Sequence, residues 1–133
     1  MFNAPPFLAA RYLIRRAHVP PQPRITNRSQ ARVVDAAHIL PVGAPGSVDH
    51  VRNGIALSPT YHRAFDASLI YLDERRRMLI NEGQLHILDG LHLAGGAEVF
   101  QRPLGTIFLP PDPDQRPSVD FIRRANSLRQ INA

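Results

Sequence analysis

Four side chains between residues 38 and 66 have the types that hydrolytic and metal chemistry require. His38 is followed by Asn53 and then by His62, and Asp66 lies four residues after His62. Residues at i and i+4 of a helix point the same way, so His62 and Asp66 would share one face. A neutral imidazole and a carboxylate are suitable ligands for a divalent metal. The spacing therefore predicts a compact polar cluster.

The elements that would position this cluster follow from apolar runs and the residues that interrupt them. The apolar run over 32–40 predicts a strand that contains His38. A loop of about a dozen residues, rich in Gly, Pro, Asp and Asn, follows it, and loops of that length are often functional. The run over 55–57 predicts a second strand. Ser58 and Pro59 then have the residue types of a helix N-cap and first helical position.

Further elements are expected on both sides of this segment. Residues 6–18 have apolar residues at helical spacing and predict a helix, and a proline-rich arm follows it as far as residue 30. The remaining expected elements are a hairpin, two short strands and a capped C-terminal helix, at residues 69–81, 85–88, 106–109 and 118–131.

Three short motifs surround the four polar residues. They read DAAHI at 35–39, NGIAL at 53–57 and HRAFD at 62–66. Their order, spacing and flanking residues resemble the HNH endonuclease family, in particular a branch with the pattern D/E-A-A-H-I, N-G-[IL]-A-L and H-R-x-F-D. A looser likeness extends through the hairpin and the C-terminal stretch LPPDPDQRPSVDFI. The resemblance implies a ββα-metal fold and metal-dependent hydrolysis of DNA phosphodiesters.

The resemblance also implies a role for each residue of the cluster. His38 matches the general base, and imidazole suits that task because it titrates near neutral pH. His62 matches a metal ligand, and Asp66 would be the second helical ligand, with a pairing to Arg63 as the alternative. Asn53 matches an asparagine that either braces the loop or touches the metal. We favour bracing, because Asn53 ends a glycine- and proline-rich loop that needs hydrogen bonds to hold it.

Asp35 is a third candidate metal ligand. Many HNH nucleases have Asp or His immediately before the general base, where this chain has Ala37. On a regular strand Asp35 and His38 lie on opposite faces, so Asp35 would reach the metal only through a bulge. Otherwise it lies behind a metal ligand or makes a structural hydrogen bond, and His62 and Asp66 hold the ion with waters. That water-rich arrangement predicts Mg²⁺, with Mn²⁺, Ni²⁺ or Zn²⁺ as alternatives.

The charge of the chain agrees with a polyanionic partner. The 133 residues have a formal net charge of +5, and all 16 basic residues are arginine. Arginine suits bidentate phosphate contacts, although a codon bias towards arginine is an equally good explanation for most of them. The arginines that flank the cluster or follow on the next hairpin are the expected nucleic-acid contacts, and these are Arg52, Arg63, Arg75, Arg76 and Arg77.

Other classes of protein are excluded or disfavoured. The chain has no cysteine, which excludes disulfides, thiolate zinc sites and a cysteine nucleophile. No apolar run approaches the roughly 20 residues of a membrane span. The short N-terminal apolar stretch precedes its arginines, which is the wrong order for a secretory signal, so a cytoplasmic location is expected.

The sequence therefore predicts an α+β fold, with a ββα-metal core, a β-hairpin after it and flanking N- and C-terminal helices. The expected division is an N-terminal helix and arm over 1–30 and a nuclease domain over 31–133, with the motif core at 33–70 and the hairpin and helix extension at 71–133. The expected function is a metal-dependent DNA endonuclease, active alone, as a homodimer or with a recognition subunit. The alternatives are an inactive nucleic-acid-binding module of the same fold and a fragment of a larger restriction or defence protein.

Overall fold

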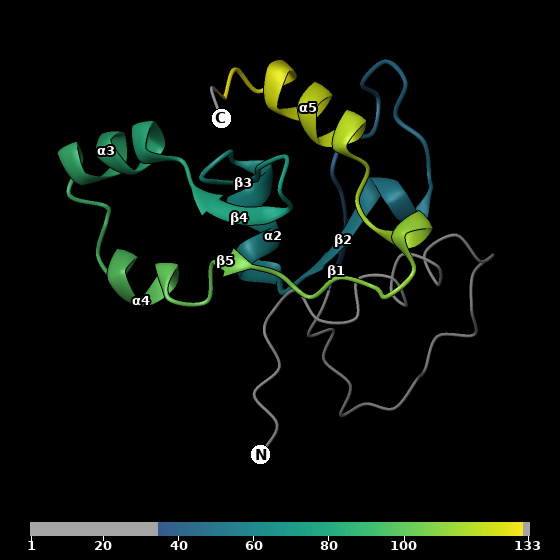
Figure 1. Ribbon diagram of the computed structural model, residues 1–133. Helices are drawn as coiled ribbons and strands as arrows, with labels where there is room; N and C mark the ends of the chain where they lie inside the picture. The colour runs from purple at the N-terminus through teal and green to yellow at the C-terminus, as the bar shows by residue number, and fades with distance from the viewer. Residues whose placement is uncertain (1–34, 132–133) are drawn as a thin grey trace, which may run out of the picture.

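The computed structural model describes residues 35–131 (Figure 1). The expected N-terminal helix and arm lie outside the described residues, as do the first residues of the strand expected over 32–40. The described elements are, in chain order, β1 (Asp35–His38), the 3₁₀ helix η1 (Val51–Asn53), β2 (Gly54–Leu57), α2 (Pro59–Asp66), β3 (Ile70–Leu72), β4 (Arg77–Ile80), α3 (Glu82–Gly90), α4 (Ala97–Gln101), β5 (Gly105–Thr106), η2 (Pro113–Gln115) and α5 (Val119–Leu128).

The first unit is an antiparallel pair of strands followed by a helix. β1 and β2 pair with Asp35 opposite Leu57 and His38 opposite Gly54. The helix α2 begins directly after β2, because the Ser58 hydroxyl accepts a hydrogen bond from the backbone N–H of Tyr61 and caps the first turn. The predicted second strand and the predicted helix start are therefore confirmed. The three elements have the order strand, strand, helix.

A second sheet has the order β3–β4–β5 and is antiparallel throughout. The predicted hairpin over 69–81 is confirmed, with Ile70 paired to Ile80 and Leu72 paired to Met78. Of the strand expected over 106–109, only the short β5 pairs with β4.

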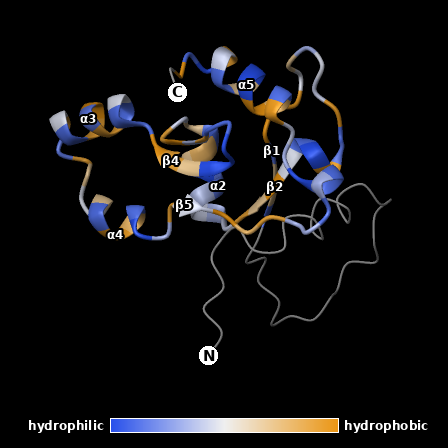
Figure 2. Ribbon diagram, in the orientation of Figure 1, coloured by the Kyte–Doolittle hydropathy of each residue, from blue (hydrophilic) through white to orange (hydrophobic). Residues whose placement is uncertain are grey.

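The prediction of a strand over 85–88 is wrong, because these residues lie within α3. Leu85 and Ile87 alternate with polar residues, as in a strand, but Leu85 and Leu88 also have helical spacing. In the structure both leucines line a small apolar pocket with Phe100 of α4. Figure 1 shows α3 and α4 on the side of the molecule away from β1 and β2, and apolar stretches of both helices are visible in Figure 2.

The core joins the two sheets through α2 and is closed by α5. α2 packs against β1, β2 and β3, and its Phe65 is fully buried. The predicted C-terminal helix is confirmed as α5, capped by the Ser118 hydroxyl, and it packs on β3 with Ile122 buried. Asn126 donates a hydrogen bond of 2.8 Å to the carbonyl of Leu72. The prediction of a small domain with mixed helices and strands is thus confirmed.

No helix within residues 35–131 combines the length and the apolar character that a membrane crossing requires.

The turn between β3 and β4 is organised by one carboxylate. Asp73 is nearly buried, and one of its oxygens accepts hydrogen bonds from the backbone N–H groups of Arg75 and Arg77 at 2.9 and 2.8 Å. The other oxygen accepts from the guanidinium of Arg77 at 2.7 and 2.8 Å. Burial raises the pKa of Asp73, but the hydrogen bonds and charge of Arg77 outweigh it and hold the pKa below its ordinary value of 3.8.

We expect Asp73→Asn to lower the free energy of unfolding by about 1–2 kcal/mol at neutral pH, because the charge-assisted bonds are lost. A lowered folded-state pKa stabilises the fold above the ordinary pKa, and that stabilisation is lost as the pH falls through the folded value. The difference in the free energy of unfolding between wild type and variant should therefore narrow below pH 3.8. Urea denaturation followed by circular dichroism between pH 7 and about pH 2.5 measures it. A gap that is independent of pH, or an equal loss in the exposed control Asp89→Asn, would contradict this role.

Candidate active site

The loop between β1 and β2 is held by the side chain of Asn53, which is 1% exposed. Its Oδ1 accepts a hydrogen bond of 2.8 Å from the backbone N–H of Leu40. Its Nδ2 group donates to the carbonyl of Val48 at 2.9 Å, and to the Leu40 carbonyl and the Ser47 hydroxyl at 3.3 Å each. The backbone carbonyl of Asn53 also accepts from the N–H of Ile39 at 3.1 Å. One buried amide thus ties the start, the middle and the end of the loop together.

His38, the last residue of β1, contacts a carboxylate from the same loop. Its Nε2 lies 2.6 Å from Oδ1 of Asp49, and both side chains reach solvent. Asp49 directly follows Val48, whose carbonyl is bonded to Asn53. A carboxylate at one ring nitrogen fixes the orientation of an imidazole. Sequence reasoning missed Asp49, because a loop acid 11 residues from its partner has no distinctive spacing.

His62 on α2 lies between two carboxylates. Its Nδ1 is 3.0 Å from Oδ2 of Asp35, and its Nε2 is 3.3 Å from Oδ2 of Asp66. Asp35 reaches the helix because its strand partner Leu57 directly precedes the Ser58 cap of α2. His62 and Asp35 are mostly buried, whereas Asp66 is 62% exposed. The structure therefore brings Asp35, His62 and Asp66 together through the two nitrogens of one ring.

The donor atoms of this group determine what metal it can hold. With its proton on Nδ1, facing Asp35, the His62 ring presents a lone pair on Nε2 towards Asp66. Two electron-rich atoms 3.3 Å apart would be stabilised by a cation. Asp35 contacts the other nitrogen, and residues 35–131 contain no group of three or more acidic or histidine side chains placed around one point. One imidazole nitrogen and one carboxylate would leave most coordination positions of a divalent cation to waters or phosphate oxygens.

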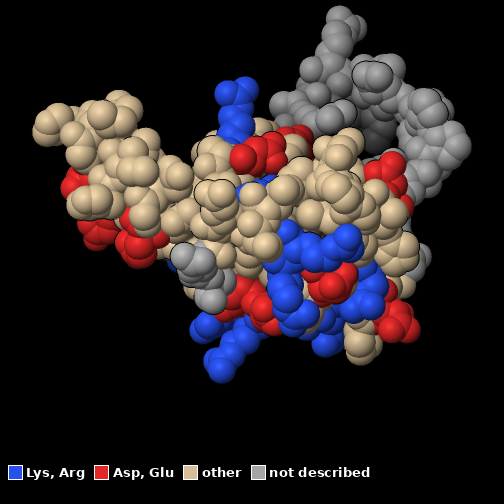
Figure 3. Space-filling model, turned by 90° about the horizontal axis from the view of Figure 1, so that it is seen from above, with Lys and Arg blue, Asp and Glu red and all other residues tan. Residues whose placement is uncertain are grey.

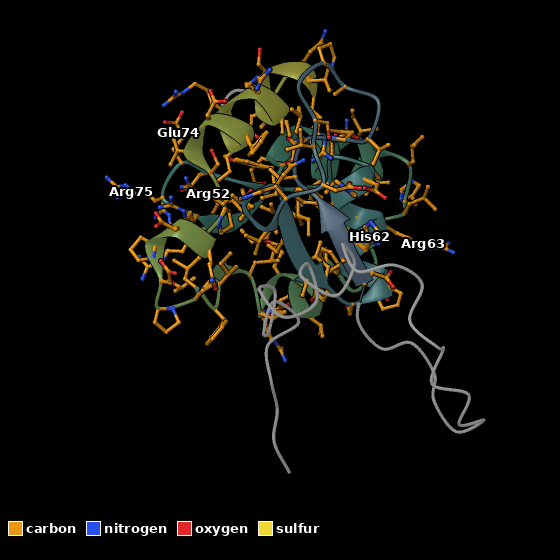
Figure 4. The ribbon with its side chains drawn as sticks, turned by 90° about the vertical axis from the view of Figure 1, so that its right-hand side faces the viewer. Arg52, His62, Arg63, Glu74 and Arg75 are labelled. Atoms are coloured by element: carbon orange, nitrogen blue, oxygen red, sulfur yellow. The ribbon has the colours of Figure 1, made fainter. Side chains whose placement is uncertain are left out.

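The five arginines expected to contact nucleic acid do not form one surface. Arg63 lies beside His62, whereas Arg52 and Arg75 lie on the opposite side of the molecule in Figure 4. Arg77 is paired with Asp73 in the β3–β4 turn.

Arg76 is held differently from its neighbours. Its Nε donates a 2.7 Å hydrogen bond to the carbonyl of Pro117, the residue that precedes the Ser118 cap of α5. It therefore belongs with the segment before α5 rather than with the tip of the hairpin.

Arg129, at the C-terminal end of α5, is a second residue that sequence reasoning missed. Its guanidinium carbon lies 4.4 Å from the centroid of the Phe65 ring, a cation–π contact. Burial lowers the pKa of Arg129, and the nearby charge of Asp66 opposes that shift. A positive charge therefore lies near the acidic end of α2. No sequence pattern marks it, because Arg129 is one of several arginines in its stretch and its partners are distant in the chain.

Comparison with known proteins supports one family. The family model for HNH endonucleases matches residues 10–73, the stretch that contains β1, β2, α2 and β3. The match supports the HNH family and indicates a nuclease. Searches of curated proteins and of solved structures gave no match.

We expect Asn53→Ala to lower the free energy of unfolding by about 2–3 kcal/mol, because the backbone groups it satisfies lose their partners. Amide hydrogen exchange in the segment from Leu40 to Val48 should rise more than exchange elsewhere. Asn126→Ala is a matched control, since it removes a buried asparagine bonded to a different backbone carbonyl. Equal exchange in the loop for the two variants would show that Asn53 does not hold it.

Proposed function

We propose that the protein is a divalent-metal-dependent DNA endonuclease of the HNH type, which hydrolyses phosphodiester bonds to 5′-phosphate and 3′-hydroxyl ends. The observation that carries the proposal is the position of His62 between Asp35 and Asp66. His62 lies on α2, the helix that follows β1 and β2, and His38 is the last residue of β1. The match to the HNH endonuclease family supports it independently.

His38 would act as the general base. In the tautomer that donates from Nε2 to Asp49, the lone pair lies on Nδ1, which accepts the proton of the attacking water. Asp49 keeps the ring oriented and stabilises the imidazolium that results. Asn53 is a positioning residue in this scheme, because it holds the loop from which Asp49 extends.

His62 and Asp66 would hold the metal ion through Nε2 and a carboxylate oxygen, with Asp35 fixing the His62 ring from the other side. When bound, the ion supplies Lewis-acid stabilisation of the charge that develops on the phosphate and on the leaving 3′ oxygen. Mg²⁺ is the ion we propose, since hard oxygen-preferring cations bind with few protein ligands. Arg63 extends from the same helix and would contact a phosphate near the ion. The oligomeric state and a cytoplasmic location stay predictions.

Supercoiled plasmid incubated with the protein and Mg²⁺ or Mn²⁺ should be nicked or linearised, and excess EDTA should stop the reaction. We expect His38→Ala to lower the rate by about 10²-fold or more, the usual contribution of a general base. His86→Ala on the exposed face of α3 should leave the rate unchanged and controls for purification. Equal cleavage by wild type and His38→Ala would reject the proposed base.

Titration calorimetry with Mn²⁺ distinguishes the proposed metal ligands, His62 and Asp66, from Asp35, which orients the His62 ring. His62→Ala and Asp66→Asn should each abolish most of the binding heat, whereas Asp35→Asn should weaken affinity by about 10-fold, as loss of an orienting carboxylate does. Asp114→Asn, in the exposed 3₁₀ helix η2, should have no effect. If Asp35→Asn removed binding as completely as Asp66→Asn, Asp35 would be a direct ligand and the proposed arrangement would be wrong.

A further inference from the structure

Three arginines from separate parts of the chain meet along the segment before α5. Arg52 of η1 donates from Nε to the carbonyl of Arg116 at 3.1 Å. Arg76, from the β3–β4 turn, donates from Nε to the carbonyl of Pro117 at 2.7 Å. Arg116 donates to the carbonyls of Pro110 and Pro111 at 2.7 and 3.1 Å. We call Arg52, Arg76 and Arg116 the arginine cluster.

The arginine cluster has no acidic partner within residues 35–131. The arginine ion pairs there are made by other residues, namely Arg77 with Asp73, Arg123 with Glu74 and Arg124 with Asp120.

The three guanidinium groups are also close enough to act on one another. Burial lowers the pKa of Arg76, and the charges of Arg52 and Arg116 lower it further. Figure 3 shows arginine atoms, with acidic atoms among them, on the part of this face away from α3 and α4. Three half-buried positive charges without a counter-charge repel one another, and a bound anion would remove that repulsion.

The way these side chains are held leaves their outer ends available. Each is anchored through Nε to a backbone carbonyl. The terminal nitrogens of Arg52 and Arg76 have no hydrogen-bond partner among the described residues, and one terminal nitrogen of Arg116 contacts Pro111. Anchored guanidinium groups that still present N–H donors are well suited to bind the oxygens of a phosphate.

The arginine cluster lies away from the candidate active site. Figure 4 places Arg52 on the opposite side of the molecule from His62 and Arg63. A phosphate at the cluster would therefore be a different one from a phosphate at His62. Arg52 directly precedes Asn53, so an anion bound there would contact the end of the same loop that carries Asp49.

We propose that Arg52, Arg76 and Arg116 form a phosphate-binding site that holds a backbone phosphate of DNA at a distance from the cleavage site. The choice of DNA as the source of the phosphate rests on the proposed function, whereas the anion site itself does not. Phosphate contacts of this kind position a nucleic acid without reading its sequence.

The first test measures thermal unfolding with inorganic phosphate against chloride at equal ionic strength, in EDTA and without DNA. A ligand that binds only the folded state raises the melting temperature, and the rise grows with the ratio of ligand concentration to dissociation constant. Phosphate should stabilise wild type more than Arg76→Gln and Arg116→Gln. Arg102→Gln removes one exposed arginine outside the cluster and should respond as wild type does. An equal response in all four proteins would overturn the anion site.

The second test measures anisotropy of a labelled DNA duplex over a range of salt concentrations, with every protein also carrying His38→Ala to prevent cleavage. Arg76→Gln and Arg116→Gln should each weaken binding and reduce the slope of log affinity against log salt by about 1, the loss of one phosphate contact. Arg102→Gln should retain the slope. Arg116 makes two hydrogen bonds to the 110–117 segment and Arg76 makes one, so Arg76→Gln keeps the test valid if Arg116→Gln fails to fold.

The two measurements distinguish the source of the phosphate. The proposal is supported if the cluster variants show both a smaller stabilisation by phosphate and a reduced slope of log DNA affinity against log salt. Loss of the phosphate response with an unchanged DNA slope would overturn DNA as the ligand and leave a site for a free phosphate compound. Neither result depends on cleavage, so a protein that binds at the cluster but does not hydrolyse DNA would overturn the proposed function alone.

Discussion

The hydrogen bonds of the Asn53 side chain are the constraint on which the rest of the site depends. The chain leaves β1 at His38 and returns to β2 at Gly54, and the intervening loop has no strand or α-helix of its own. A buried amide without partners would cost several kcal/mol, so the loop adopts the path that satisfies Asn53. That path sets where Asp49 meets His38.

His38 and His62 have different surroundings, and the difference suits them to different roles in the proposed reaction. His38 has one carboxylate, from a solvent-exposed loop residue, and one free ring nitrogen within the described part of the chain. His62 has a carboxylate at each nitrogen and is fixed on a helix anchored by the buried Phe65. The first arrangement is compatible with the general-base role proposed for His38. The second suits a group that keeps its position while a cation is bound.

Interactions between residues close in the chain made much of this fold predictable from the sequence. Contacts between residues distant in the chain were not predictable in this way. Ser58 and Pro59 define the start of α2, because N-cap side chains act within one turn. The prediction of a strand over 85–88 is wrong because a short apolar stretch fits both periods, and in the structure it forms α3, whose Leu85 and Leu88 line the same apolar pocket as Phe100. The sequence alone does not predict the pairing of Asp35 with His62, since it depends on how β1 lies against α2.

The stretch from Pro110 to Pro117, which lies between β5 and α5, has more backbone hydrogen-bond acceptors than donors. Four of its eight residues are proline, so half of its peptide units have a carbonyl and no N–H. Such a stretch cannot complete a strand pairing, and its carbonyls need side-chain donors. Arg52, Arg76 and Arg116 provide these donors through Nε, an atom that lysine lacks. Exchange of any of them for lysine would preserve the net charge but remove one of these Nε bonds, so arginine contributes here through its shape as well as its charge.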